Sequence, residues 1–254
     1  MRTNPIDNYF SFVMDDVSVP TSSKNFNVLV TGYVYGTPER EVEKVSIPGI
    51  NGDYIYDHGK YSNIQVTYHC EIAKDFRNNI FGLNNALGRA MKSYTTLRDS
   101  YDTEHYRMGR FVGLTAPEPG AYADSGKFDV IFDCKPQRFV SDPEPYIITG
   151  TTEIHNPTGY PSLPIIFVDH AGTFTITNNT VGGGHSMTVM QSFFDEIGGI
   201  LIINCERKVC YSQSGRVNAN KYVSGIFPSL EFGYNTVTTA NNISMTINPR
   251  WWTL

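Results

Sequence analysis

The sequence lacks the features of a membrane or secreted protein. No stretch approaches the ~20 consecutive apolar residues that a membrane-spanning helix needs, so we expect no membrane insertion. Residues 1–7 contain a single cation and no apolar segment, which is not the pattern of a secretory signal. We therefore expect the chain to be made in a cytosol and to stay there until another component moves it.

Cysteine is also scarce, with four residues in 254. Cys70 and Cys134 lie in apolar, strand-like runs, where small buried thiols are common. Cys205 and Cys210 flank residues 206–209, and this spacing permits a disulfide across a hairpin. A reducing compartment favours two free thiols instead, and the neighbourhood offers no further ligands for zinc. The sequence predicts no metal site and no cofactor.

A basic stripe is absent as well. The formal net charge is -5, whereas proteins that hold nucleic acid through its phosphates carry clustered lysines and arginines. The densest basic group contains Arg98, Arg107 and Arg110, and the acidic residues Asp99 and Asp102 dilute it. Specific nucleic-acid binding is therefore not expected.

No catalytic motif is recognisable. None of the six histidines lies in a known motif, and no G-x-S-x-G nucleophile elbow is present. Asp57-His58 and Asp169-His170 are adjacent acid–histidine pairs, but neighbouring residues on a strand point to opposite faces. We predict that the chain is not an enzyme, and we assign it no catalytic residues.

The sequence does contain the pattern of many strands. Aromatic residues make up 13% and charged residues 18%, a balance that excludes a disordered chain. Residues 41–47 alternate polar and apolar, which predicts a strand in a sheet with one wet face. In the first half, β-branched and aromatic runs predict strands over residues 28–35, 41–47, 54–57, 64–72, 94–97, 106–114 and 128–134.

One amphipathic helix is predicted from Asp75, the expected N-cap, to about Met91. Gly82 weakens it intrinsically, so packing must hold it. One apolar stripe with spacings of three and four residues is formed by Phe76, Ile80, Leu83, Leu87 and Met91.

A proline-rich stretch, residues 135–164, separates this half from the rest of the chain. Proline cannot donate to a sheet ladder, so we expect no central strand there and predict two domains, 1–140 and 141–254. The second half shows no good helix. Its turn signals favour a β-sandwich with short strands over residues 165–168, 173–177, 186–190, 199–204, 208–212 and 243–247.

Three groups of segments carry a resemblance to a known family. The first is IPGINGD (47–53) with GKY (59–61), and the second is GKFDVIFDCKP (126–136) leading to NPTG (156–159). The third is the C-terminal series LIIN (201–204), FPSL (227–230), GYN (233–235) and PRWW (249–252). In order, spacing and overall length, the chain resembles the distal tail protein family of siphophages over essentially its full length.

The resemblance implies a mainly β fold. Its first domain would be β-rich with one covering α-helix, and its second a galectin-like or jelly-roll β-sandwich. It also implies a structural virion protein, assembled in the host bacterial cytoplasm, that forms a homohexameric ring at the distal end of a long non-contractile tail. The implied partners are other copies, the major tail tube protein, a tail-associated lysin-like tip protein, and receptor-binding or other baseplate proteins. DNA would pass through the ring without specific binding, which the acidic balance suits.

The candidate interface residues are four tyrosines, Tyr33, Tyr35, Tyr54 and Tyr56. They surround a predicted hairpin whose exposed edge strands suit pairing across a subunit boundary. Tyrosine offers contact area with a polar end, which makes it a common interface anchor. The alternative interpretation is that these are half-buried tyrosines of an ordinary sheet.

A carbohydrate-binding module of a tail or cell-surface protein is the alternative function. A sandwich can stack sugars on aromatic side chains of one face, yet the only tryptophans, Trp251 and Trp252, are adjacent and point to opposite sides. They do not make a platform. Burial of one of them, anchoring a terminal strand that could return to the first domain, is the favoured interpretation.

Overall fold

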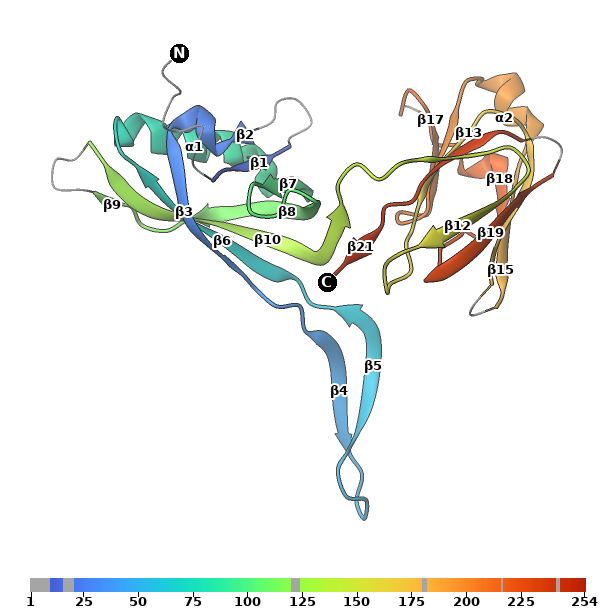
Figure 1. Cartoon of the computed structure of the whole chain (residues 1–254), viewed down its shortest axis with the longest axis horizontal. Coiled ribbons are helices and arrows are strands. Elements are labelled where there is room, and N and C mark those ends of the chain that lie inside the picture. Colours follow the sequence, from blue (N-terminus) through green and yellow to red (C-terminus); the bar gives the residue numbers. More distant parts are fainter. Residues whose placement is uncertain (1–9, 16–20, 120–123, 180–181, 216, 241–242) are drawn as a thin grey trace. The chain divides into compact units, whose positions relative to one another are not determined.

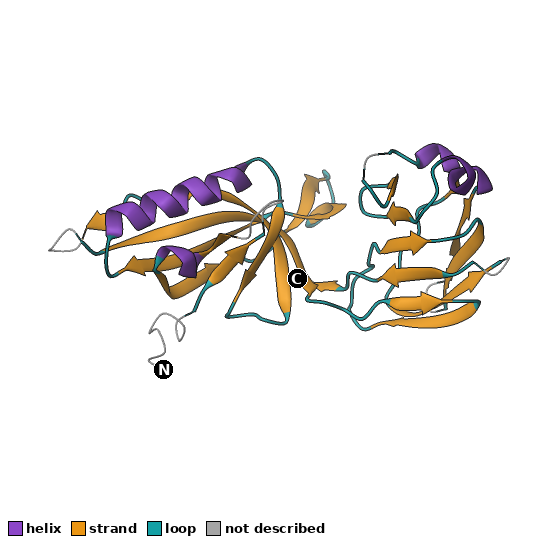
Figure 2. Ribbon diagram, turned by 90° about the horizontal axis from the view of Figure 1, so that it is seen from above, coloured by secondary structure: helices purple, strands orange, loops and turns teal. Residues whose placement is uncertain are grey.

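The computed structural model describes residues 10–15, 21–119, 124–179, 182–215, 217–240 and 243–254. Residues 1–7, which were considered above as a signal sequence, lie outside these ranges. The chain divides into two compact units, Met1–Ser141 together with Leu254, and Asp142–Thr253. Both are built mainly from antiparallel strands (Figures 1 and 2).

Unit 1 is one curved sheet with a helix on one face. The strands within it run in the order β2-β1-β7-β8-β10-β6-β3, with β9 beside β10. In chain order its elements are β1 (Phe12–Met14), β2 (Thr21–Ser22), η2 (Ser23–Phe26), β3 (Val28–Tyr35), β4 (Arg40–Ser46), β5 (Asp53–Tyr61), β6 (Ile64–Ile72), α1 (Phe76–Gly88), η3 (Arg89–Met91), β7 (Thr95–Asp99), β8 (His105–Leu114), β9 (Glu118–Pro119) and β10 (Gly126–Val140).

The core of unit 1 lies between this sheet and α1. The Phe132 ring packs against those of Phe12, Tyr68 and Phe111, with ring centroids 5.5, 5.9 and 6.0 Å away. The helix buries Phe76, Ile80, Leu83 and Leu87 on this sheet. Close packing explains the glycine at position 82, because a Cβ there would lie 3.0 Å from the Phe26 ring of η2.

The opposite face of the same sheet is polar and charged. Cross-strand pairs on it include His69 with Asp129 at 2.7 Å and Arg110 with Asp133 at 2.9 Å. Such alternation of a buried and a wet face is the usual pattern of an antiparallel sheet.

Unit 2 is a sandwich of two five-stranded sheets. Their orders are β11-β20-β13-β16-β17 and β12-β19-β14-β15-β18. In chain order its elements are β11 (Tyr146–Ile148), β12 (Thr151–Asn156), β13 (Ile165–Val168), β14 (Gly172–Asn178), β15 (Gly184–Val189), α2 (Gln191–Glu196), β16 (Leu201–Asn204), β17 (Val209–Ser212), η4 (Asn220–Tyr222), β18 (Val223–Gly225), β19 (Gly233–Thr239), β20 (Met245–Asn248) and β21 (Trp252–Thr253).

The end of the chain packs on unit 2 through its tryptophans. Trp251 is buried, with 6% of its surface exposed. The Trp252 ring stacks on Tyr160 with centroids 4.4 Å apart, and its Nε1 donates a hydrogen bond to the carbonyl of Pro161 at 2.9 Å. Neither ring is free to act as a platform for a sugar.

The four cysteines are free and buried. Burial raises the pKa of the Cys70 thiol, and it raises the pKa of Cys134, Cys205 and Cys210 to about 12. In the β16–β17 hairpin, Cys210 pairs with Ile203, and Cys205 lies in the turn. The interpretation of two free thiols in this hairpin agrees with the structure.

The predicted mainly β fold is confirmed. The strands predicted for residues 28–35, 64–72 and 165–168 coincide with β3, β6 and β13. The covering helix is also present, because its apolar stripe with spacings of three and four residues fits one face of an α-helix.

The prediction that no central strand runs through residues 135–164 is wrong at the start of that stretch. Strand β10 continues to Val140 through Pro136, and its register against β8 shifts between Cys134 and Arg138. An irregularity of this kind leaves a residue without a ladder bond, which is where a proline is tolerated. The strands β11 and β12 also lie inside this stretch, but both are edge strands of their sheets, where proline-rich segments are tolerated.

Details of the helices need correction as well. Met91 was assigned to the apolar stripe but is 45% exposed, because the α-helix ends at Gly88 and a 3₁₀ turn rotates Met91 away. Asp75 precedes the helix with φ 54°, and its side chain makes no capping hydrogen bond to the backbone. The second half does contain a helix, the short α2.

The prediction of opposite faces also fails for Asp169 and His170. His170 Nδ1 lies 2.9 Å from the carboxylate of Asp169. Both residues follow β13 in a bend, where the strand alternation no longer applies.

We expect Leu83→Ala to destabilise unit 1 by about 3 kcal/mol, because it removes a fully buried side chain and leaves a cavity. Phe81→Ala on the same helix is the control, since 59% of Phe81 is exposed and its loss should cost little. Urea unfolding followed by circular dichroism measures both. Equal losses for the two variants would contradict the helix orientation described here.

Candidate assembly surface

The most unusual feature of unit 1 is the hairpin β4–β5, which we call the arm. It leaves the sheet between β3 and β6 and extends away from it (Figure 1). Its strands form a separate two-stranded sheet. At its base the chain passes close to β6: the N–H of Gly36 donates to the carbonyl of Gln65 at 2.9 Å, and a Cβ on Gly36 would lie 3.1 Å from that oxygen.

The arm has no buried face. Every residue of β4 is exposed, and so is every residue of β5 except Tyr61, which is half-buried. The alternation of polar and apolar residues in residues 41–47 was predicted to mark a strand with one wet face. The prediction of a single wet face is wrong, because nothing in the described chain covers the other face of the strand. The exposed apolar side chains of the arm are Val42, Val45, Ile47, Ile50, Tyr54, Ile55 and Tyr56.

Local polar contacts give the arm its shape. Arg40 Nη2 pairs with Asp57 at 2.7 Å, and the N–H of Gly59 donates to the same carboxylate at 2.8 Å. The hydrogen bonds from Arg40 and Gly59 lower the pKa of Asp57. Exposed ion pairs contribute little free energy, and isolated two-stranded hairpins are marginally stable in water. The two strands of the arm therefore contribute little stability of their own, and contact with a further surface would stabilise it.

A second exposed feature is a row of rings that we call the aromatic ridge, formed by Phe10, Tyr101, Tyr33 and Tyr35. Phe10 stacks on Tyr101 with centroids 3.9 Å apart, Tyr101 contacts Tyr33 at 4.2 Å, and Tyr33 contacts Tyr35 at 4.5 Å. Phe10 is 48% and Tyr33 43% exposed. One stacked pair and two tilted pairs of rings at this exposure form an amphipathic surface.

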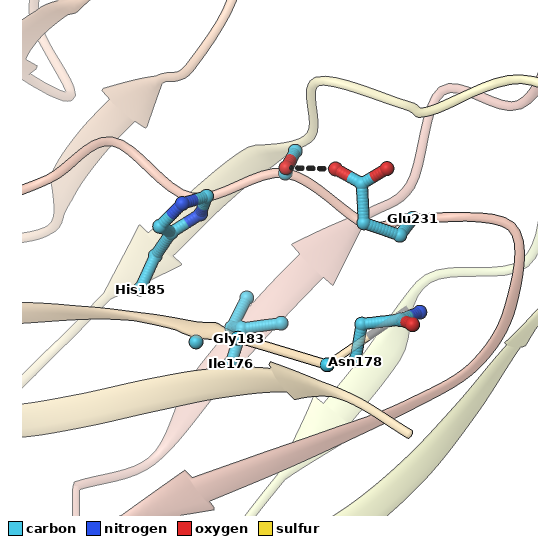
Figure 3. A pocket seen from close by; sticks show the side chains of 8 residues that line it. Ile176, Asn178, Gly183, His185 and Glu231 are labelled. Carbon is cyan, nitrogen blue, oxygen red and sulfur yellow. Dashed lines mark hydrogen bonds between the residues drawn. The ribbon is translucent and has the colours of Figure 1, made fainter. Parts of the chain in front are cut away.

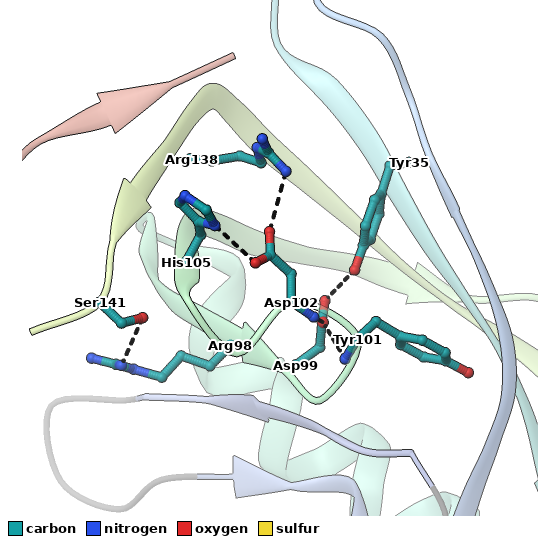
Figure 4. Close-up of polar contacts among 8 residues, drawn as sticks. All are labelled: Tyr35, Arg98, Asp99, Tyr101, Asp102, His105, Arg138 and Ser141. Carbon is teal, nitrogen blue, oxygen red and sulfur yellow. Dashed lines mark hydrogen bonds and ion pairs between the residues drawn. The ribbon is translucent and has the colours of Figure 1, made fainter. Parts of the chain in front are cut away.

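The carboxylate of Asp99 holds the ridge to the sheet (Figure 4). Its Oδ2 accepts hydrogen bonds from the hydroxyls of Tyr35 at 2.6 Å and Tyr68 at 2.5 Å. Its Oδ1 accepts from the backbone N–H groups of Tyr101 and Asp102, both at 3.0 Å. One side chain thus fixes a β3 ring, a core ring and the loop that carries Tyr101.

The network continues into the loop between β7 and β8. Asp102 lies 2.8 Å from His105 Nδ1 and accepts a hydrogen bond from Arg138 at 3.2 Å (Figure 4). The Arg107 guanidinium lies over the Tyr35 ring, 5.1 Å from its centroid. Burial and the hydrogen bond to Asp99 raise the pKa of Tyr35 well above 10. These contacts make the base of the ridge rigid.

The structure places the four predicted tyrosines in two groups. Tyr33 and Tyr35 belong to the aromatic ridge, whereas Tyr54 and Tyr56 lie on the arm, 61% and 54% exposed. Tyr35 alone is half-buried and held by hydrogen bonds, as the alternative interpretation expected.

Sequence reasoning missed Phe10, Tyr101 and Asp99. Asp99 was interpreted as a solvated acid that dilutes nearby basic charge, and no sequence pattern indicates that it meets Tyr35, 64 residues away.

Unit 2 contains a concavity of about 230 Å³ at one end of the sandwich (Figure 3). Its polar groups are engaged within the fold: Asn178 donates to the carbonyls of Phe232 and Tyr234, and Glu231 accepts from the hydroxyl of Ser229 at 2.6 Å. The remaining wall is formed by Ile176, His185 and the glycines 182–184. This arrangement closes the end of the sandwich and offers little for a ligand to bind.

Among the described residues, no helix is long and apolar enough to cross a membrane. Within the same residues, no group of three or more His, Cys, Asp or Glu side chains is arranged to hold a metal ion.

No family model matches the sequence, and no curated protein is significantly similar to it. Solved structures do match. The first is described as the SPP1 Dit protein, a paradigm of the hub adsorption apparatus in phages that infect Gram-positive bacteria. It is 12% identical, the match covers 97% of this chain and 100% of that one, and the TM-score is 0.67.

The chain has the fold of a phage Dit protein. The resemblance inferred from the sequence is confirmed at this level.

Two further matches come from the phage p2 baseplate in its activated conformation. Chains from the structures with Sr and with Ca are each 9% identical to this chain, with TM-scores of 0.52 and 0.51. The matches cover 94% of this chain in both cases, and 98% and 96% of the baseplate chains. The Dit fold therefore extends over both units.

We expect Tyr35→Phe to reduce the loss of stability at alkaline pH. The pKa of Tyr35 is raised above its ordinary value of 10.0, so above pH 10 the folded chain binds more protons than the unfolded chain, and stability falls as pH rises. Without this phenol, the loss between about pH 9 and about pH 11 should shrink by about 1 kcal/mol. Urea unfolding across this range measures it.

The matched control is Tyr54→Phe, which removes an exposed hydroxyl from the arm. Parallel stability curves for Tyr35→Phe and the parent chain would show that the phenol of Tyr35 is not held as described.

Proposed function

We propose that this chain is a structural protein of a phage tail, a distal hub component that assembles with copies of itself into a ring. The observation that carries the proposal is the arm, a two-stranded ribbon with both faces in solvent. Its apolar side chains and marginal intrinsic stability require a partner surface. The Dit fold over the whole chain supports the same function, since the SPP1 protein with this fold is described as a hub.

The partner surface we propose is another copy of unit 1. A ring uses heterologous contacts, in which one face of each subunit meets a different face of the next, and it closes when the rotation per subunit fits. Unit 1 offers two different surfaces of this kind, the arm and the aromatic ridge. Strand β3 is also the last strand of its sheet; Phe10 bridges to it at Val30, and the part that carries Tyr33 and Tyr35 is the edge proposed for pairing. Tyr33, Tyr35, Tyr54 and Tyr56 are the proposed interface residues.

The finer roles follow from this proposal. We infer a hexameric ring that joins the tail tube to the tail tip, with unit 2 as a platform for receptor-binding or other baseplate proteins. The tube protein and a tail-associated lysin-like protein are the proposed neighbours on either side. DNA would cross the ring without specific contacts, which a formal net charge of -5 favours. The proposed role depends on complementary contact surfaces and requires no catalytic residues.

We expect the purified chain, or the chain on assembled tails, to form rings of six copies of 28.5 kDa each. The double substitution Tyr54→Ser and Tyr56→Ser should shift the equilibrium to monomers, because exposed tyrosines that become buried at an interface each contribute about 1–2 kcal/mol. Light scattering gives the mass, and negative-stain images show the rings.

The control is Phe81→Ser, which removes a similarly exposed ring from α1 of the same unit. It should leave the assembly unchanged. The proposal fails when the parent chain forms no closed oligomer even on tails, or when the double variant assembles as well as the parent.

A further inference from the structure

One sheet of unit 2 has an outer face of unusual composition. In the sheet β12-β19-β14-β15-β18, the inward residues are buried, and those that point outward are mostly threonine and serine. We call this surface the hydroxyl face; its members are Thr151, Glu153, His155, Thr173, Thr175, Thr177, Asn179, Ser186, Thr188, Ser224, Tyr234, Thr236 and Thr238.

The registry of the strands arranges the hydroxyls in rows across the sheet. Thr151 pairs with Thr238, Thr238 with Thr175, and Thr175 with Ser186, so one row spans four strands. Five strands at a spacing of about 4.8 Å make the face about 20 Å wide, which suits a short linear chain better than a single small molecule.

The hydroxyl face carries almost no charge. Glu153 is its only Asp, Glu, Lys or Arg residue, and no described lysine or arginine forms an ion pair with it. The wet face of the unit 1 sheet is the internal comparison. There, cross-strand ion pairs such as Arg110 with Asp133 and Lys127 with Glu71 occupy the equivalent positions. Solubility alone therefore does not explain the uncharged face of unit 2.

At one corner of the face, polar and aromatic groups from three neighbouring chain segments converge. Asn179 follows β14, and its Nδ2 lies 3.3 Å from the carboxylate of Glu153 on β12 and 3.0 Å from the hydroxyl of Thr236 on β19. The rings of His155 and Tyr234 are in contact, with centroids 4.6 Å apart. Tyr234 is 51% exposed.

These groups match the chemistry of a neutral saccharide. Sugar hydroxyls need several donors and acceptors side by side, which amide, carboxylate and hydroxyl groups supply. The apolar face of a pyranose ring packs on an exposed aromatic ring, the role that Tyr234 can take. We propose that the hydroxyl face binds a neutral saccharide chain, with the corner of Glu153, Asn179, Tyr234 and Thr236 as its principal subsite.

Other occupants fit less well. A protein interface needs an apolar centre, but Tyr234 is the one exposed large hydrophobic residue among the members of the face, and others of unit 2, such as Ile147, Met190 and Ile226, lie outside it. A phosphate or sulfate group needs lysine or arginine, which the face lacks. The inference depends on the side chains of unit 2 and is independent of ring assembly.

The test uses the full chain with dextran, lactose, cellobiose and chitotriose as neutral probes and dextran sulfate as the charged comparison. We expect at least one neutral probe to bind with a dissociation constant of about 0.1–10 mM, as for a shallow site that buries little surface. Dextran sulfate should bind no better than dextran. Titration calorimetry and saturation-transfer NMR measure the binding.

Tyr234→Ala and Glu153→Gln should each weaken binding about tenfold, because each removes a principal contact. Tyr234→Phe keeps the ring and should retain most of the affinity. The matched control is Phe81→Ala in unit 1, an exposed ring outside the face. Fluorescence of the buried Trp251 and of Trp252, which stacks on Tyr160 of unit 2, shows whether each variant of that unit is folded.

Two outcomes overturn the proposal. One is that none of the neutral probes binds the folded parent chain. The other is that binding persists unchanged in folded Tyr234→Ala and Glu153→Gln chains. Loss of saccharide binding with intact rings, or loss of rings with intact saccharide binding, separates this inference from the proposed assembly.

Discussion

The arm imposes the main constraint on this protein. A two-stranded ribbon with no helix or sheet packed on its face cannot bury its apolar side chains in a core of its own. Val45, Ile55 and Tyr54 remain in water, whereas the core of unit 1 buries comparable side chains such as Val66, Ile72 and Tyr68. Selection against aggregation would remove such a ribbon unless another surface covers it in the working state. The exposed apolar side chains of the arm are therefore the surface that the proposed ring assembly would cover.

The aromatic ridge is the surface proposed to receive the arm of another copy. It is tied to the core of unit 1 through the carboxylate of Asp99, which holds Tyr35 and Tyr68 by their hydroxyls. Because Tyr68 is almost fully buried, the ridge inherits the rigidity of the sheet. A preorganised receiving surface loses little conformational entropy on contact, which favours association.

Local patterns of the sequence were sufficient for the elements that obey them. The runs that became β3, β6 and β13, and the apolar stripe of α1, follow simple periodicities, and so does the mainly β class. The strands of the arm were predicted, but the absence of a covered face was not. The alternation in residues 41–47 is the same whether or not another layer packs on the strand. Strand β10 runs through Pro136 because a register shift accommodates it, and no local rule reports such a shift.

Long-range contacts account for the rest of what could not be predicted. Asp99 and Tyr35 are far apart in sequence, and the corner of Glu153, Asn179 and Thr236 joins three segments that are distant along the chain. The tryptophans drew attention as the only candidates for sugar stacking, yet Tyr234 is the exposed ring beside polar groups. The proposed saccharide contact is therefore Tyr234 and neither tryptophan.

The buried thiols have a consequence for durability. A thiol reacts with oxidants and with other disulfides as the thiolate, and burial keeps Cys134, Cys205 and Cys210 protonated up to a pKa of about 12. At neutral pH almost no thiolate is present, and the sulfurs are shielded from solvent. We therefore expect air oxidation to form no covalent links between copies of the chain through these three cysteines.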